Sequence, residues 1–364
     1  MTGADRRFMS LALGLARRGL GNVWPNPAVG CVIVREGRIV GRGWTQPGGR
    51  PHAEVRALAQ AGAAARGAVV YVTLEPCAHH GKTPPCSEAL IAAGVARVVS
   101  AMEDPDPRVS GGGHEKLRAA GIAVETGCLE AEARALQAGF LSRITRNRPW
   151  LALKLASSFD GRIATATGES QWITGPEARA RVHAMRAEFD AVMVGGGTAR
   201  ADDPLLTVRN FTPLRAPVRV IVSETLDLPS ARLAGSLDQA PLWLMHGPRA
   251  PREARDYWSE LGAELFDLPA LAGGGLDPFA VMEALGARGL TRVFCEGGGQ
   301  FAAALATAGL VDELIGFTAG VLLGSDGRAG IGGMGVGNLA DAPRFRLVET
   351  TRIGADVLHR WRRD

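Results

Sequence analysis

Two short stretches hold the residues whose types and spacing suggest chemistry most clearly. PHAEV contains His52 and Glu54, and TLEPCAHHGKTPPC contains Cys77 and Cys86. One imidazole and two thiolates are ligands that zinc accepts, and three protein ligands leave its fourth position open for catalysis. Zinc lowers the pKa of a water molecule at such a position toward neutrality. We therefore predict a catalytic zinc site made of His52, Cys77 and Cys86.

Glu54 completes this pattern, because a carboxylate beside the metal can carry a proton from water to a leaving amine. The arrangement H-x-E followed by P-C-x-x-C is the signature of zinc-dependent nucleobase deaminases. Here eight residues separate Cys77 from Cys86 instead of two. The inserted residues are polar or cationic, which suits a phosphorylated substrate. They include His79, His80, Lys82 and Thr83.

Two other interpretations of the histidines and cysteines stay open. A structural zinc would need a fourth protein ligand, for which His79 or His80 is available. Alternatively, the cysteines are buried without a metal. The proline before Cys77 and the glutamate of H-x-E favour the catalytic interpretation. The remaining cysteines lie in apolar strand or turn contexts and are expected to be packing residues: Cys31, Cys128 and Cys295.

The composition indicates a globular enzyme. The 364 residues suffice for two domains, and 46% hydrophobic with 21% charged residues is typical of globular proteins. A net charge of +4 and only 2 Tyr give no support for nucleic-acid binding. Five sparse cysteines argue against disulfides and for a reducing compartment. No apolar run approaches the roughly 18 residues of a membrane span. We expect a cytoplasmic protein without nucleic-acid or membrane partners.

The first 145 residues alternate strand and helix patterns. The N-terminus is expected to form an amphipathic helix rather than a signal peptide. A hairpin is predicted over 28–44 with its turn at Glu36-Gly37, strands over 68–76, 95–103 and 122–127, and helices over 52–62, 86–94, 114–121 and 129–143. This alternation predicts a layered sheet with helices on both faces.

The second half repeats the α/β alternation after a basic segment, 143–149, that we interpret as an interdomain linker. Strands are predicted over 150–161, 188–197, 217–224, 241–247 and 291–299. No G-x-G-x-x-G follows a strand, so a Rossmann domain is not expected. The glycines of 297–299 precede a helical run, where backbone amides could hold a pyrophosphate. The same glycines could also simply connect the strand to the helix.

Three stretches resemble the deaminase half of the bacterial bifunctional riboflavin-biosynthesis deaminase/reductase family: PNPAVGCVIV (25–34), GGRPHAEV (48–55) and TLEPCAHHGKTPPC (73–86). In that family the long spacing between the cysteines is normal. The stretch WLALKLASSFDGRIATATGESQWITG (150–175) resembles the reductase half, which is similar to dihydrofolate reductase in fold. The resemblance spans nearly the whole chain. It implies a cytidine-deaminase-like three-layer α/β/α domain over 1–145 and a dihydrofolate-reductase-like α/β domain over 149–364.

The resemblance also implies the reactions. The first domain, with one zinc ion, would remove an amino group hydrolytically from a phosphorylated diamino-ribosylaminopyrimidinone. The second would reduce the ribosyl group of the product to a ribityl group with NADPH. The family forms homo-oligomers, so a homodimer or homotetramer is expected.

Site residues are carried over one by one from the resemblance. His52, Cys77 and Cys86 would bind zinc, and Glu54 would move the proton. Substrate contacts are expected from Asn26, Lys82, Ser170, Arg186, Leu206, Arg209 and Glu296. Cofactor contacts are expected from Ala156, Trp172, Thr198, Asp202, Ser223, Gly298, Gly299 and Gln300.

Several of these assignments have an alternative. Arg186 and Arg209 suit a phosphate, which a guanidinium grips with two hydrogen bonds, but each could be an ordinary helix or loop arginine. Asn26 could cap a turn, and Trp172 could anchor the core. The proton donor for the reduction is open between Lys154 and Asp202. The acidic Glu224 after Ser223 leaves selectivity between NADPH and NADH open.

Two other functions compete with the bifunctional enzyme. The zinc domain could deaminate a nucleoside or a tRNA, with the second domain a binding module. Alternatively, a structural zinc could accompany a scaffold domain. Binding of a pyridine nucleotide by the second half distinguishes the first alternative, and metal analysis of Glu54→Ala distinguishes the second.

Overall fold

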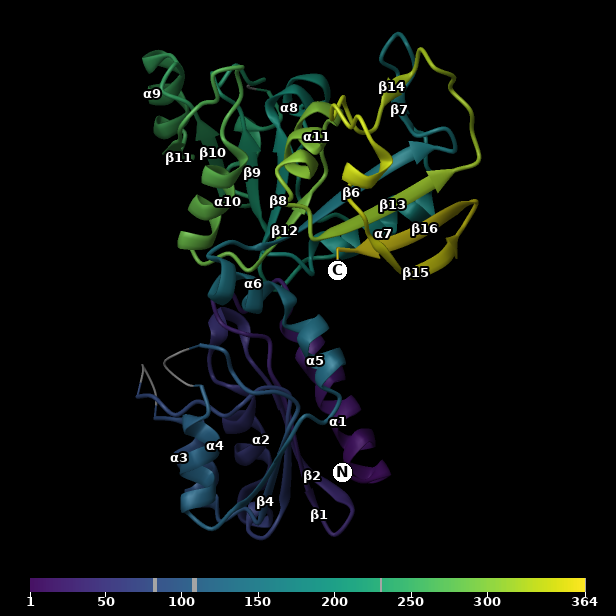
Figure 1. The fold of residues 1–364 in the computed structure, drawn as a ribbon. Helices are drawn as coiled ribbons and strands as arrows, with labels where there is room; N and C mark the ends of the chain where they lie inside the picture. The colour runs from purple at the N-terminus through teal and green to yellow at the C-terminus, as the bar shows by residue number, and fades with distance from the viewer. Residues whose placement is uncertain (81–83, 107–109, 230, 364) are drawn as a thin grey trace. The chain divides into compact units, whose positions relative to one another are not determined.

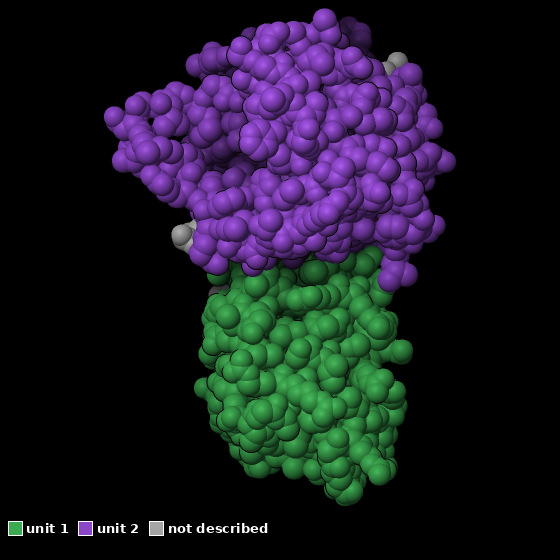
Figure 2. Space-filling view, turned by 90° about the vertical axis from the view of Figure 1, so that its right-hand side faces the viewer, with its two compact units in different colours: residues 1–147 green, residues 148–364 purple. Residues whose placement is uncertain are grey.

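The chain folds into two compact units. The computed structural model describes residues 1–80, 84–106, 110–229 and 231–363, so the predicted phosphate ligand Lys82 lies outside the described residues. The units are Met1–Asn147 and Arg148–Asp364 (Figure 2). The segment predicted as a linker begins inside a helix, because α6 extends over Ala138–Arg146 and ends at Asn147. No helix within the described ranges is long and apolar enough to cross a membrane.

The first unit is built on one five-stranded sheet with the order β2-β1-β3-β4-β5 (Figure 1). Its strands are β1 Gly30–Arg35, β2 Arg38–Trp44, β3 Val69–Val72, β4 Arg97–Ser100 and β5 Ala123–Thr126. β1 is antiparallel to β2 and β3, whereas β3, β4 and β5 are parallel. The predicted hairpin is confirmed, and both turn residues have positive φ, 51° at Glu36 and 75° at Gly37. Two such residues form the tight turn that matches strand twist.

Helices cover both faces of this sheet, as predicted. They are α1 Gly3–Ala16, α2 Ala53–Ala61, α3 Cys86–Ala93, α4 Gly112–Ala119, α5 Glu130–Leu136 and α6. On β1, a Cβ at Gly30 would lie 1.9 Å from the Ala12 carbonyl oxygen of α1. The neighbouring residue Cys31 pairs with Gly43 of β2, where a Cβ would lie 2.1 Å from the Ala53 carbonyl oxygen of α2. Successive strand residues point to opposite faces, so α1 and α2 pack on opposite sides.

One predicted helix is wrong in its continuity. The pattern over 129–143 predicts a single helix, but the structure has α5 and α6, separated at Gln137, where ψ is 5°. The side chain of Gln137 is buried and donates a hydrogen bond of 2.7 Å to the Ala28 carbonyl oxygen. This tertiary hydrogen bond is not visible in the periodicity of the sequence.

The second unit contains a nine-stranded sheet with the order β11-β10-β9-β8-β12-β6-β13-β16-β15. Its strands are β6 Trp150–Ser158, β8 Ala191–Gly195, β9 Val218–Val222, β10 Leu242–His246, β11 Glu264–Asp267, β12 Arg292–Cys295, β13 Glu313–Ala319, β15 Arg346–Ile353 and β16 Asp356–Arg362. The strands from β11 to β13 are parallel, and β16 and β15 extend the sheet antiparallel. β7 Arg162–Ala164 and β14 Arg328–Ala329 form a separate pair. The sequence patterns did not predict β11, β13, β15 or β16. β15 is largely exposed along its length and so lacks an alternation of apolar residues.

The helices of the second unit connect the parallel strands. They are α7 Pro176–Arg186, α8 Gly196–Asp202, α9 Arg252–Glu260, α10 Pro278–Ala287 and α11 Gly299–Thr307. α7 packs its Val182 and Met185 against Phe294 of β12 and Phe317 of β13. The loops that follow β8, β9 and β12 leave the sheet at the carboxyl ends of parallel strands, where α/β proteins bind their ligands. Thr198, Ser223 and Glu296 lie in or just after these turns.

Candidate functional site

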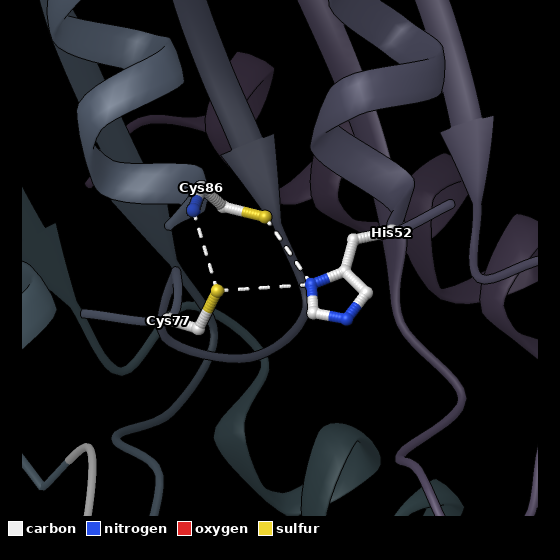
Figure 3. Close-up of side chains that lie close together, drawn as sticks. All are labelled: His52, Cys77 and Cys86. Carbon is white, nitrogen blue, oxygen red and sulfur yellow. Dashed lines mark hydrogen bonds between the residues drawn. The ribbon is translucent and has the colours of Figure 1, made fainter. Parts of the chain in front are cut away.

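The three predicted zinc ligands meet in the first unit (Figure 3). His52 is the residue before α2, Cys86 is the first residue of α3, and Cys77 lies in the loop after β3. His52 Nδ1 lies 3.3 Å from Cys86 Sγ and 3.7 Å from Cys77 Sγ. Tetrahedral zinc bonds to nitrogen and sulfur imply a separation of about 3.5 Å between two such ligand atoms. The donor set and its spacing therefore fit a zinc ion.

The fourth position of this site is not taken by either histidine of the inserted loop. In the described part of the chain, the group of ligand atoms around His52 contains only Cys77 and Cys86 besides it. His80 instead faces Glu88, with 3.4 Å between Nε2 and Oε2. The prediction of three protein ligands agrees with this geometry, and the structural-zinc alternative does not.

Backbone and burial set the electrostatics of the zinc site. Cys77 Sγ accepts a hydrogen bond of 3.3 Å from the Cys86 N–H at the start of α3. Hydrogen bonds from Cys86 and His52 lower the pKa of Cys77 to about 4, which favours the thiolate that binds metal. Glu54, in the first turn of α2, is 3% exposed. Burial raises its pKa to about 7, although His52 opposes this shift.

The other three cysteines are packing residues, as expected. Cys31, Cys128 and Cys295 are completely buried, and none forms a disulfide. Cys31 and Cys128 belong to the core of the first unit, and Cys295 ends β12 in the second.

Asn26 lies against the segment that leads to His52. A Cβ on Gly49 would stand 1.9 Å from Asn26 Nδ2, so the glycine allows this close approach. Asn26 Nδ2 also donates a long hydrogen bond of 3.4 Å to the Val23 carbonyl oxygen. The side chain is thus near the zinc-ligand segment and part of a turn at once.

In the second unit, Arg186 and Glu296 form one buried ion pair, although 110 positions separate them in the chain. Arg186 Nε and Nη2 donate to the two carboxylate oxygens of Glu296 at 2.5 and 3.0 Å. The third donor, Nη1, bonds to the Thr207 carbonyl oxygen at 2.7 Å. Lys154 Nζ lies 3.9 Å from Glu296 Oε2. Three of the five N–H groups of Arg186 thus bond to protein groups, and a phosphate contact of this residue stays a prediction.

The loop over 206–209 is tied to α7 beside this pair. The Arg209 N–H donates to His183 Nδ1 at 3.3 Å. Burial and the nearby arginines lower the pKa of His183 to about 4, so the ring is neutral and can accept. Leu206 is buried in the core with φ of 54°, which leaves its backbone rather than its side chain for a substrate contact. Arg209 itself is exposed.

The predicted cofactor residues gather in part at the carboxyl ends of β8, β9 and β12. A Cβ at Gly298 would lie 2.7 Å from Thr198 Oγ1, and one at Gly196 would lie 2.8 Å from Ser223 Oγ. Gly298 has φ of 85° and precedes the first residue of α11, so its position requires glycine and exposes a helix start. A negatively charged pyrophosphate fits backbone amides at such a helix start.

Other predicted residues have different surroundings. Gly299 also has no room for a side chain. A Cβ there would lie 2.6 Å from the Ala329 carbonyl oxygen, which packs against it. Trp172 is 65% exposed, so the core-anchor alternative is wrong, and the Arg179 guanidinium lies 4.6 Å from its ring centroid. Among the other predicted site residues, Ala156 and Ser170 are half-buried, whereas Asp202 and Gln300 are exposed.

The sequence interpretation missed two residues near the sites. His183 has no motif around it and is identified only by its contact with the Arg209 backbone. Glu75 stands in the quoted TLEPC stretch, but nothing in the sequence indicates which groups its carboxylate contacts. Both act through hydrogen bonds to backbone N–H groups of segments distant in the chain.

Comparisons with known proteins agree with this two-site architecture. Residues 2–102 match the family profile described as the cytidine and deoxycytidylate deaminase zinc-binding region, and residues 149–359 match the RibD C-terminal domain. The riboflavin biosynthesis protein RibD of Escherichia coli is 45% identical, over 97% of this chain and 98% of the relative. The RibD of Aquifex aeolicus is 39% identical, over 97% of both chains.

Solved structures give the same result. Acinetobacter baumannii RibD aligns with a TM-score of 0.88 and 39% identity, covering 99% of this chain and 98% of that one. A Thermotoga maritima protein named diaminohydroxyphosphoribosylaminopyrimidine deaminase/5-amino-6-(5-phosphoribosylamino)uracil reductase aligns with a TM-score of 0.85 and 35% identity, covering 99% of each chain. Since full-length similarity joins the zinc site of one unit to the reductase fold of the other, the chain belongs to the RibD family of bifunctional deaminase/reductases of riboflavin biosynthesis.

Proposed function

We propose that the first unit hydrolyses an amino group from a phosphorylated diamino-ribosylaminopyrimidinone and that the second unit reduces the ribosyl group of the product. The name of the Thermotoga maritima relative states this pair of activities for that protein. The observation that carries the proposal here is the three-ligand cluster of His52, Cys77 and Cys86 with the buried Glu54 beside it.

In the deaminase unit, a zinc ion held by these three ligands would lower the pKa of a water molecule toward neutrality. Glu54 would take up a proton from that water and deliver it to the leaving amine, since its pKa of about 7 lets it do both near neutral pH. Asn26, beside the segment that leads to His52, would orient the pyrimidine. Lys82 is the proposed ligand of the substrate phosphate.

In the reductase unit, NADPH would supply the hydride when bound. Ala156, Trp172, Thr198, Asp202, Ser223, Gly298, Gly299 and Gln300 are its proposed contacts. Glu296, fixed by Arg186, would bind substrate hydroxyls, and Ser170 and the Leu206 backbone would line the same site. Arg209 and Arg186 are the proposed contacts of the substrate phosphate, with Arg186 also bonded to Glu296 and Thr207. Lys154, 3.9 Å from Glu296, is better placed than the exposed Asp202 to donate the proton.

The experiment that tests this function uses purified full-length protein, the diamino substrate and NADPH. Ammonia release and NADPH oxidation are followed separately. We expect stoichiometric ammonia first, and NADPH oxidation only after deamination or when the deaminated intermediate is supplied directly. Ammonia release from cytidine, without oxidation of NADPH in either case, would favour a nucleoside deaminase joined to a binding module.

Two further properties belong to this proposal. Five free cysteines, of which four are buried, suit a reducing cytoplasm.

A homodimer or homotetramer stays a prediction. The exposed edge strand β15 is compatible with pairing because an uncovered edge offers unpaired backbone groups. Sedimentation velocity across a concentration series measures the oligomeric state, and a single monomeric species would contradict self-association.

A further inference from the structure

Glu75 is a buried carboxylate that the deaminase chemistry does not use. It is 4% exposed and stands two positions before Cys77. Its oxygens accept four backbone hydrogen bonds, with Oε2 bonded to the N–H groups of Asp104 and Gly111 at 3.1 and 3.0 Å. Oε1 accepts from the N–H groups of Gly113 and His114 at 2.9 and 3.2 Å. One side chain thus bonds to Asp104, shortly after β4, and to the backbone at the start of α4.

The first turn of α4 also packs closely against the segment that carries Cys77. A Cβ at Gly113 would lie 1.9 Å from the carbonyl oxygen of Pro76, the residue before Cys77. Lys116 of α4 donates a hydrogen bond of 2.8 Å from Nζ to the carbonyl oxygen of Ala78, the residue after it. The peptide that carries Cys77 is therefore in contact with α4 on both sides of the ligand.

The first turn of α3 holds Cys77 from another direction. Ser87 donates to the Cys77 carbonyl oxygen with its N–H at 3.2 Å and with its hydroxyl at 3.0 Å. The Cys86 N–H bonds to Cys77 Sγ. Cys77 is thus clasped between the amino ends of two helices, and Glu75 connects it to α4.

A second metal site is the alternative role for this carboxylate. Glu75, Glu103 and His114 place ligand-type atoms within 4.8 Å of one another, and His114 Nε2 is buried without a hydrogen-bond partner. However, each Glu75 oxygen already accepts two N–H groups, which occupies the lone pairs that a metal would need. Glu103 is exposed. The geometry therefore favours a role for Glu75 in holding backbone groups in place over a role in binding a metal.

We propose that Glu75 is a positioning residue of the zinc site. Its carboxylate pins the first turn of α4, and α4 in turn holds Cys77 at the distance from His52 that a tetrahedral ion requires. Groups that orient metal ligands contribute roughly 10–100-fold to metal affinity or activity. The proposal concerns the zinc site, and it rests on the proposed deamination only for its kinetic readout.

The test is Glu75→Gln in the full-length protein, which keeps the shape but turns amide hydrogens toward the backbone N–H groups. Cobalt(II) is bound to the metal-free protein, and its visible spectrum and affinity are measured without substrate. We expect altered cobalt bands, metal binding weaker by about 10–100-fold, and a deamination kcat reduced by a similar factor. Reduction of the deaminated intermediate should keep its rate, which shows that the chain is folded.

The matched control is Glu103→Gln, the exposed carboxylate of the same cluster, which should leave spectrum and affinity unchanged. If Glu75→Gln does not yield folded protein, Lys116→Met is the second test, because it removes the bond to Ala78 together with an exposed contact of 3.2 Å to Glu88. An unchanged cobalt spectrum and affinity in the folded variant would overturn the proposal. So would two zinc ions per wild-type chain with one lost in Glu103→Gln. A normal cobalt site in a wild-type protein that releases no ammonia would reject the proposed reaction and leave this inference intact.

Discussion

Glu54 at the zinc site and Glu296 at the reductase site are both largely buried, and the surroundings of the two are opposite. Glu54 is 3% exposed, and burial raises its pKa to about 7. Burial would also raise the pKa of Glu296, but Arg186 and Lys154 outweigh it and lower that pKa to about 2. The first carboxyl group gains and loses a proton near neutral pH, whereas the second stays charged.

This difference separates two uses of a buried carboxylate. A group with a pKa near the working pH is an efficient proton carrier. A group fixed by a bidentate arginine is a rigid hydrogen-bond acceptor whose charge is compensated in place. We infer that Glu54 serves as the proton shuttle and Glu296 as an anchor for substrate hydroxyls.

The largest expected effect is on deamination in Glu54→Gln. The amide cannot carry a proton, so the rate of ammonia release should fall by about 10²–10⁴-fold. Reduction of the deaminated intermediate should proceed at the wild-type rate, and zinc content by atomic absorption should stay at one per chain. Loss of the metal together with the activity would contradict a proton-shuttle role and indicate a structural one.

Removal of Arg186 should break the anchor in the second unit. Arg186→Ala leaves the largely buried Glu296 carboxylate without its bidentate partner and with only the looser Lys154 contact, and breaking a buried pair costs about 3–5 kcal/mol of unfolding free energy. Urea denaturation of the full chain measures it, with reductase activity lost and the cobalt spectrum of the zinc site unchanged. The control is Arg181→Ala on the same helix, whose partner Glu188 is 3.7 Å away on the surface and contributes at most about 1 kcal/mol.

Lowering the pH should remove, over a defined range, the stabilisation that the charged Glu296 carboxylate provides. The pKa of Glu296 is about 2 in the folded protein against an ordinary 4.5, so the unfolded chain binds the proton first as the pH falls. The stabilisation from this group is therefore complete above about pH 4.5 and is lost between there and about pH 2. Urea midpoints of wild type and Glu296→Gln should converge as the pH falls through this range. A constant difference between them would contradict a charged Glu296.

The zinc site was predictable from sequence because its residues lie in short motifs with local structural signals. His52 and Glu54 occur together at a helix start, and Cys86 opens another helix after two prolines. The fold has to bring the helix start with His52 to the segment with Cys77 and Cys86, which lie 25 and 34 positions further along the chain. The α/β class was predictable for a similar reason, since the buried parallel strand β8 is a continuous apolar run and β9 departs from one only at Arg219.

The reductase site was less predictable, because its contacts join distant segments. Arg186 is the last residue of α7 and Glu296 follows β12, and no local pattern pairs them. The sequence favoured a phosphate contact for Arg186, and it gave no sign that three of its N–H groups bond to Glu296 and Thr207. The hydrogen bonds of Glu75 to α4 and the helix break at Gln137 are equally hard to predict from local sequence patterns. In both, one side chain bonds to the backbone of a segment brought near only by the tertiary fold.

The smallest predicted effect concerns Lys154, the second cation near Glu296. At 3.9 Å it makes no bidentate contact, so it should hold the Glu296 charge far less firmly than Arg186 does. In Lys154→Gln the acid loss of stability should move upward by less than in Arg186→Ala, since Lys154 has one contact of 3.9 Å and Arg186 has two hydrogen bonds to the same carboxylate. The same urea titration as for Glu296→Gln measures the shift. A shift as large as that of Arg186→Ala would make Lys154 a main partner of the anchor, and a loss of reduction without any shift would identify it as the proton donor.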